Sequence, residues 1–119
     1  VEAVTEQNDP NGKLGKQGGY SATVYFSSDL VDSSKTYADE AYTGIPAVGA
    51  DGGGAVEVYA NVDDAQERDA YLGAFDGGLL SSGSHVVVGT CVVRTSDLLT
   101  ASQQQTMQDA IIVSLTRLG

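Results

Sequence analysis

Two segments of the chain, 20–27 and 55–60, alternate between apolar and polar or aromatic side chains with the period of a β-strand. The apolar parity of these segments consists of Ala22, Val24, Phe26, Val56, Val58 and Ala60. The opposite parity consists of Thr23, Tyr25, Glu57 and Tyr59. Such alternation is typical of a sheet that packs one face against a core. We therefore predict two strands of one sheet.

A third segment, 85–95, contains five valines and is apolar on both parities over much of its length. A strand that is buried on both faces loses the alternation of apolar and polar positions. We predict that residues 85–95 form one central strand.

The segment 63–75 follows the second strand and has the periodicity of a helix. Its inward stripe is predicted to consist of Ala65, Arg68, Leu72 and Phe75. Asp63 is the expected N-cap, because a carboxylate there can accept a hydrogen bond from the first turn. Two glycines at 77–78 are expected to end the helix.

The segment 100–118 is predicted to form a second helix, with apolar residues at helical spacing such as Met107, Ile111 and Leu115. Thr100 and Gln103 have the spacing of a capping box, in which each side chain bonds to the backbone N–H of the other residue. We therefore expect this helix to begin directly after Thr100.

These elements predict an α+β fold, a two-layer sandwich in which two helices lie on one face of a three- to four-stranded sheet. The expected order is strand–strand–helix–strand–helix. Residues 20–119 are predicted to form a single domain, and 1–19 a linker or leader, in which a short strand fits within 1–5. The irregular segment 29–54 is either a functional loop or hides a short element at 34–42; we favour partial order.

If both helices cover the valine face, the opposite face stays open. Its four residues, Thr23, Tyr25, Glu57 and Tyr59, would then form a candidate partner surface, because aromatic residues are enriched at interfaces. A homodimer could form through this face. The other interpretation is that loop 29–54 folds over it, and the two are left open.

The charge of the chain argues against several partners. Sixteen acidic residues face six basic ones, for a formal net charge of -10. Binding to the phosphates of nucleic acids requires clustered Lys and Arg, and the six basic residues are scattered, so we expect no nucleic-acid partner. No apolar run approaches the ~20 residues that span a bilayer, so we expect no direct insertion of this segment into a membrane.

The lone cysteine excludes an internal disulfide and invites a test for thiol–imidazole chemistry with the lone histidine. If Cys91 and His85 lie on one strand, their Cα atoms are about 20 Å apart at ~3.3 Å per residue, so they cannot meet. We expect Cys91 to be a small buried side chain and His85 to be exposed or to act as a cap.

Other motifs for chemistry are incomplete. One His and one Cys cannot supply a zinc ligand set, and the segment 9–12 lacks the alternating oxygen ligands and closing Glu of a calcium loop. The glycine-rich segment 51–54 has no lysine and precedes a strand, so it fails as a phosphate loop. The carboxylate pairs at 39–40 and 63–64 are expected in a loop and at a helix start. We therefore predict no catalytic, cofactor or metal residues.

Several short blocks of the chain resemble an uncharacterised extracytoplasmic domain of exported proteins and lipoproteins of Gram-positive bacteria, actinobacteria especially. The resemblance extends over about residues 20–118, and the blocks that carry it are Gly54–Asn61, Asp64-Ala65, Arg68, Tyr71-Leu72, Gly83–Thr90, Val93-Arg94 and Leu99–Ala101. It implies an extracellular or cell-surface location and brings no catalytic residues. The chain begins with Val1 rather than Met, so we expect a signal or lipid anchor to have been removed upstream.

Two functions are consistent with these observations. The first is a secreted or lipid-anchored, non-enzymatic binding or accessory module with a protein or cell-wall partner. The alternative is a small dimeric, ferredoxin-like α+β enzyme or ligand-binding protein, with a pocket behind the sheet at Tyr25 and Tyr59.

Overall fold

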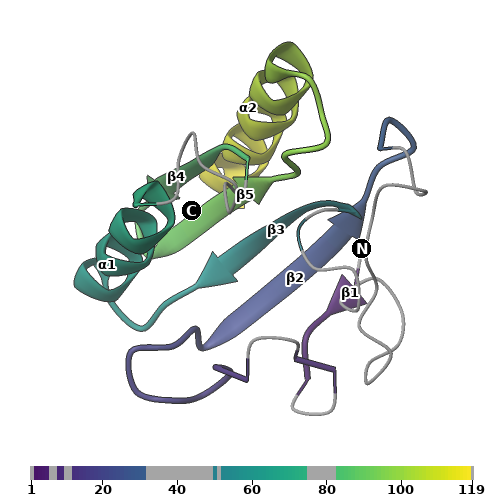
Figure 1. Ribbon diagram of the computed structural model, residues 1–119. Coiled ribbons are helices and arrows are strands. Elements are labelled where there is room, and N and C mark those ends of the chain that lie inside the picture. Colours follow the sequence, from purple (N-terminus) through teal and green to yellow (C-terminus); the bar gives the residue numbers. More distant parts are fainter. Residues whose placement is uncertain are drawn as a thin grey trace.

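The computed structural model describes residues 2–5, 8–9, 12–31, 50, 52–74 and 83–118. Five strands and two helices make up this part of the chain, with three strands before the first helix and two before the second (Figure 1). They are β1 (Glu2–Ala3), β2 (Ala22–Ser27), β3 (Gly53–Val58), α1 (Val62–Gly73), β4 (His85–Val88), β5 (Cys91–Thr95) and α2 (Ala101–Leu118).

The five strands form one sheet in the order β1-β2-β3-β5-β4, and every neighbouring pair is antiparallel. The predicted α+β class is confirmed, and the sheet has more strands than the three or four expected. Strands β2 and β3 arise where the alternation predicts them, with Thr23 opposite Glu57 and Val24 opposite Val56. The two parities predicted from the sequence are therefore the two faces of this sheet.

The predicted single strand 85–95 is wrong, because the segment folds back on itself as a hairpin. Gly89 has a positive φ of 61°, and Val88 pairs with Cys91 across the two-residue turn. A glycine in this backbone conformation matches the twist of a tight hairpin. The valines occupy two strands, so β5 is interior and β4 lies at the edge of the sheet.

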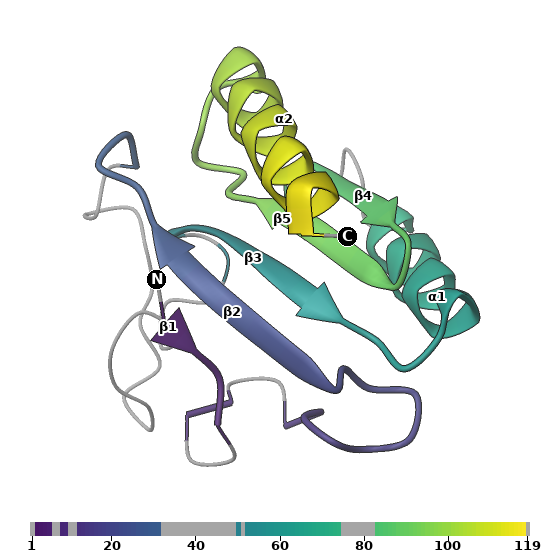
Figure 2. The ribbon, with the colours of Figure 1, turned by 180° about the vertical axis from the view of Figure 1, so that it is seen from behind.

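The two helices lie on opposite faces of the sheet, which corrects the expectation that both lie on one face (Figures 1 and 2). Helix α1 packs its buried Ala65 and Leu72 against Tyr59 and Val92. Helix α2 lies on the other face, where Met107, Ala110, Ile111, Ser114 and Leu115 border an open apolar groove of about 410 Å³ with Phe26 and Val56. The face that carries Glu57 has to be covered because it also carries Tyr59, Val92 and Val87, and α1 supplies both apolar contacts and an arginine to it.

The start of α2 is predicted correctly, whereas the start of α1 is not. The Gln103 N–H donates to Thr100 Oγ1 at 3.2 Å, and the Thr100 N–H donates to Gln103 Oε1 at 2.9 Å, which completes the capping box. The N-cap of α1 is Asn61, whose Oδ1 accepts the N–H of Asp64 at 2.8 Å, rather than Asp63. Asparagine and aspartate are comparable N-caps, so propensity alone does not separate these positions.

Part of the expected linker is integrated into the sheet. Strand β1 pairs with β2, with Glu2 opposite Tyr25, and buried Val4 packs with Tyr25 and Ala55. Buried Ala50 joins the same cluster. The element expected at 34–42 and the glycines at 77–78 lie outside the described residues.

Candidate functional site

A buried carboxylate joins β3, α1 and β5 beneath α1. The Glu57 side chain is fully buried, and Arg68 donates to it from two nitrogens, Nε to Oε1 at 3.0 Å and Nη2 to Oε2 at 3.3 Å. Arg94 Nη1 donates to Oε2 at 3.1 Å, and the Tyr59 hydroxyl donates to Oε1 at 2.7 Å. We call these four residues the Glu57 cluster. Two arginines and a tyrosine thus satisfy one buried carboxylate.

The Glu57 cluster holds its members in fixed protonation states. Burial alone would raise the pKa of Glu57, but the charges of Arg94 and Arg68 and their hydrogen bonds outweigh it and lower this pKa. Burial and the Glu57 carboxylate raise the pKa of Tyr59. Although burial opposes it, Glu57 also raises the pKa of Arg68. The carboxylate therefore stays ionised and the phenol stays neutral across the physiological range.

A second buried carboxylate, Asp9, organises the loop that precedes β2. Asp9 Oδ2 accepts the N–H of Lys13 at 2.8 Å and that of Leu14 at 2.9 Å, and Oδ1 accepts the Tyr20 hydroxyl. Gly15 and Gly18 in this loop have positive φ angles, which glycine adopts without strain. The loop therefore has a defined shape, and both carboxylate oxygens of Asp9 accept hydrogen bonds from it.

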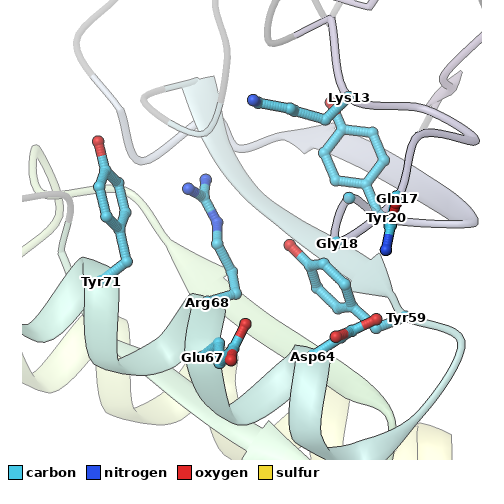
Figure 3. Close-up of a pocket in the computed structure, with 10 residues that line it drawn as sticks. Lys13, Gln17, Gly18, Tyr20, Tyr59, Asp64, Glu67, Arg68 and Tyr71 are labelled. Atoms are coloured by element: carbon cyan, nitrogen blue, oxygen red, sulfur yellow. The ribbon is translucent and has the colours of Figure 1, made fainter.

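An open cleft lies between this loop and α1, with a volume of about 460 Å³ (Figure 3). Arg68 and Tyr71 rise side by side from α1, and Lys13 and Tyr20 come from the facing loop. The lining residues are Lys13, Gln17, Gly18, Gly19, Tyr20, Tyr59, Asp64, Glu67, Arg68 and Tyr71. Both walls are thus fixed by buried carboxylates, one wall by Asp9 and the other by Glu57.

The tyrosines and Arg68 give the cleft an ordered aromatic interior. The rings of Tyr20 and Tyr59 meet edge to face, with centroids 6.3 Å apart. The Arg68 guanidinium lies 5.6 Å from the centre of the Tyr71 ring. Because Arg68 bonds Glu57 through Nε and Nη2, its Nη1 edge is directed away from the carboxylate. Arg68 thereby links the buried Glu57 cluster to the surface of the cleft.

The four residues predicted as a partner surface are all buried. Their exposed fractions are 2% for Thr23, 1% for Tyr25, 0% for Glu57 and 4% for Tyr59. α1, the loop ending at Tyr20, and Ala50 cover this face, so the expectation of an open face is corrected. These four side chains therefore do not offer the exposed surface that a homodimer through this face would require. Glu57 and Tyr59 instead support the cleft.

The structure also corrects the reasoning about His85 and Cys91. The two residues lie on different strands of the hairpin and on opposite faces of the sheet. The sheet itself separates their side chains, whereas the sequence suggested separation by distance along one strand. His85 is neither exposed nor a cap: its side chain is 10% exposed, and its Nδ1 lies 2.6 Å from Asp69 Oδ1 on α1. Cys91 is half-buried and free.

The remaining sequence candidates are not brought together into a site. Asp64 lines the cleft, and the neighbouring Asp63 is exposed in the first turn of α1. The pair at 39–40 and position 51 lie outside the described residues, and Gly53 and Gly54 of the glycine-rich segment are the first two residues of β3. Across the residues that the structure describes, no group of three or more His, Cys, Asp or Glu side chains could hold a metal ion.

Sequence reasoning missed most of the residues that line the cleft. Gly18 and Gly19 line it but fall within the segment 1–19 that was expected to be a linker or leader, and Asp9, which shapes the loop, was considered as part of an incomplete calcium loop at 9–12. A signal for the loop is an aspartate whose side chain accepts the backbone N–H groups four and five residues later. A tyrosine eleven residues later donates its hydroxyl to the same carboxylate. That pattern is too common to be specific.

Comparison of the chain with protein-family models, with curated proteins and with solved structures finds no match. In the described part of the chain, neither helix is both long and apolar enough to cross a membrane. The geometry of the cleft therefore carries the functional argument.

Proposed function

We propose that this chain is an extracytoplasmic, non-enzymatic binding module whose ligand site is the cleft between α1 and the loop at residues 12–20. The observation that carries the proposal is the support of both cleft walls by buried carboxylates, Glu57 behind α1 and Asp9 behind the loop. A site whose walls are already held in place loses little conformational entropy when a ligand binds. Its volume of about 460 Å³ lies within the range of small-molecule sites.

The electrostatics of the cleft support binding rather than acid–base catalysis. A general acid or base works best with a pKa near the working pH. The pKa of Glu57 is lowered and the pKa of Tyr59 is raised, so both pKa values move further from neutral pH. Arg94, Arg68 and Tyr59 also occupy both oxygens of Glu57, which leaves that carboxylate poorly placed to accept a proton from a ligand.

The extracytoplasmic location rests on the acidic composition of the chain and on its resemblance to domains of exported Gram-positive proteins. It is tested by detecting the native protein with an antibody in culture medium, surface and cytosolic fractions of the source cells. Recovery in the medium or surface fraction is expected. Recovery in the cytosolic fraction alone would contradict this part of the proposal.

The alternative of a dimeric ferredoxin-like protein is less well supported. It requires an open tyrosine face against which a second sheet can pack, but Tyr25 and Tyr59 are buried within the chain. The helices also lie on both faces of the sheet instead of leaving one face free (Figure 2).

The proposed binding site is tested by NMR titration of the labelled protein with a panel of small probes: glucose, cellobiose, glycine, trialanine and inorganic phosphate. We expect at least one probe to cause saturable shift changes at backbone amides of Gln17, Gly18, Glu67 and Tyr71, with the probe recovered intact. Saturable changes confined to the α2 groove, or no response at millimolar concentrations, would overturn the cleft assignment. Turnover of a probe that is lost with one point mutation would overturn the non-enzymatic role.

A matched pair of variants separates the cleft from the rest of the surface. Tyr71→Ala removes a side chain that is 58% exposed at the cleft, and Val113→Ala trims one that is 49% exposed on α2. We expect binding to weaken in the first variant and to stay unchanged in the second. Equal effects of the two substitutions would contradict a ligand site at the cleft.

A further inference from the structure

We infer that the ligand of this cleft is an uncharged saccharide, an inference that rests on the proposed function of the cleft. The balance of charge, the types of hydrogen-bonding group and the exposed aromatic ring all favour this class of ligand. Each is a property of residues that line the same hollow (Figure 3).

The charges around the cleft do not favour an anion. Lys13 is a cation on one wall, but Asp64 and Glu67 place two carboxylates on the other. The charge of Arg68 is offset by Glu57 at 3.0 Å. The chain as a whole carries a net charge of -10, which repels anionic ligands at long range. A phosphate or a sugar acid therefore gains little here.

A strongly cationic ligand is disfavoured for a local reason. The Lys13 ammonium offers donors and no acceptors, and it brings a positive charge to the cleft from the loop. A cation that pairs with Glu67 or Asp64 would enter a cleft that also holds this ammonium. Charges of both signs on facing walls thus favour a ligand with no net charge.

The hydrogen-bonding groups of the cleft suit a ligand that both donates and accepts. Carboxylates at Asp64 and Glu67 accept, Lys13 and Arg68 donate, and the Gln17 amide and Tyr71 hydroxyl do both. A hydroxyl group donates one hydrogen bond and accepts up to two. Several hydroxyls on one rigid ring can therefore satisfy both walls at once without charge.

The aromatic residue at the edge of the cleft matches the apolar face of a sugar ring. Tyr71 is 58% exposed, which is high for a large apolar side chain, and Arg68 holds it by packing against its ring. A flat ring presents a large contact area and a polar hydroxyl tip with little rotamer entropy to lose. The C–H groups on one face of a pyranose can pack on such a ring while the hydroxyls reach the polar walls.

The test compares ligands that share one ring and differ in charge: glucose, glucosamine, glucuronate and glucose 6-phosphate, with trialanine as a non-sugar control. Shift changes of the backbone amides of Gly18 and Tyr71 report binding to the intact chain. We expect glucose to bind more tightly than its three charged derivatives. We expect Tyr71→Ala to weaken glucose binding about three- to tenfold, the range of an aromatic packing contact, while Val113→Ala leaves it unchanged.

Glu67→Gln provides a second variant that leaves the core untouched, because Glu67 is exposed on α1. A measurable weakening of glucose binding in this variant is expected. Tighter cleft binding by a charged derivative or by trialanine would overturn the saccharide inference and leave the proposed binding site standing. Cleft amides that respond to none of these probes would overturn the saccharide inference, and a further lack of response to cellobiose, glycine and inorganic phosphate would overturn the proposed binding site as well.

Discussion

Glu57→Gln is the substitution that tests the Glu57 cluster most directly. Glutamine has nearly the same shape as glutamate, so the change removes the charge without opening a cavity. Its amide nitrogen is a donor, and it must face at least one of the donors of Arg68 or Arg94 that now point at the carboxylate. The two arginines would then remain largely buried beside a neutral group.

The expected loss of stability is large for a single substitution. Removal of one partner from a buried ion pair typically costs about 3–5 kcal/mol, because the remaining charge is left without compensation. Glu57 is fully buried, and Arg94 and Arg68 are 12% and 23% exposed at their side chains, so solvent screens the pairs weakly. For a domain of this length the cost corresponds to a fall in melting temperature of roughly 10–20 °C.

The measurement is urea denaturation followed by circular dichroism, with Glu67→Gln as the matched control. Glu67 lies on α1 and is exposed, so the same chemical change there is expected to alter the free energy of unfolding by less than about 0.5 kcal/mol. A double-mutant cycle of Glu57→Gln with Arg94→Met is expected to give a coupling energy of roughly 1–3 kcal/mol. In the double variant, methionine replaces the long arginine stem with an apolar chain, so no charge at position 94 is left unpaired.

The reasoning is refuted if Glu57→Gln and Glu67→Gln unfold at the same urea concentration. It is also refuted if the double-mutant cycle shows no coupling, since the two residues would then contribute independently. If Glu57→Gln alone is too unstable to purify, the cost of the substitution is measured by comparing Arg94→Met with the double variant, in which only Arg68 is left unpaired.

Three further predictions follow from the same structure. The lowered pKa of Glu57 contributes stability that is fully present above the ordinary pKa of 4.5 and is lost as the pH falls through the pKa of the folded state. The urea midpoint of Glu57→Gln should therefore fall less steeply with pH below about pH 4.5 than that of the unchanged protein. Thr100→Ala should lower the free energy of unfolding by about 1 kcal/mol through loss of the α2 cap, while the exposed mid-helix Thr106→Ala should not lower it. Gly54→Ala should destabilise the fold more than Gly89→Ala in thermal melts, because a Cβ at Gly54 would lie 2.3 Å from the Arg94 carbonyl oxygen, whereas Gly89→Ala faces open space and adds only the strain of an alanine at a φ of 61°, about 1–2 kcal/mol; similar melting temperatures would contradict the close β3–β5 packing.

The sequence predicts the parts of the fold that depend on local pattern. Alternation locates β2 and β3, and the capping box locates the start of α2. Each of these signals is carried by residues that lie only a few positions apart in the chain. The hairpin at Gly89 is missed since its two strands place valines on both sides of a short interruption, and a single glycine seldom outweighs such an apolar segment.

The cleft is harder to predict because its residues come from distant positions. Glu57 alternates with valines, so its position suggests exposure, and its burial depends on arginines 11 and 37 residues away. A buried polar residue can be recognised only with its partners, which a one-dimensional pattern does not supply. The same holds for Asp9 and Tyr20, whose contact gives a glycine-rich segment a fixed shape.

The sharing of one carboxylate by two arginines also limits how the sequence can diverge. A neutral residue at position 57 would leave two buried arginines unpaired, and the loss of either arginine would leave the buried glutamate with a single cationic partner. Intermediates with one change are therefore selected against, while sequences with apolar residues at all three positions could fold well. Among homologues, positions 57, 68 and 94 are expected to be retained or replaced together, and co-variation of these three columns would reveal the cluster without a structure.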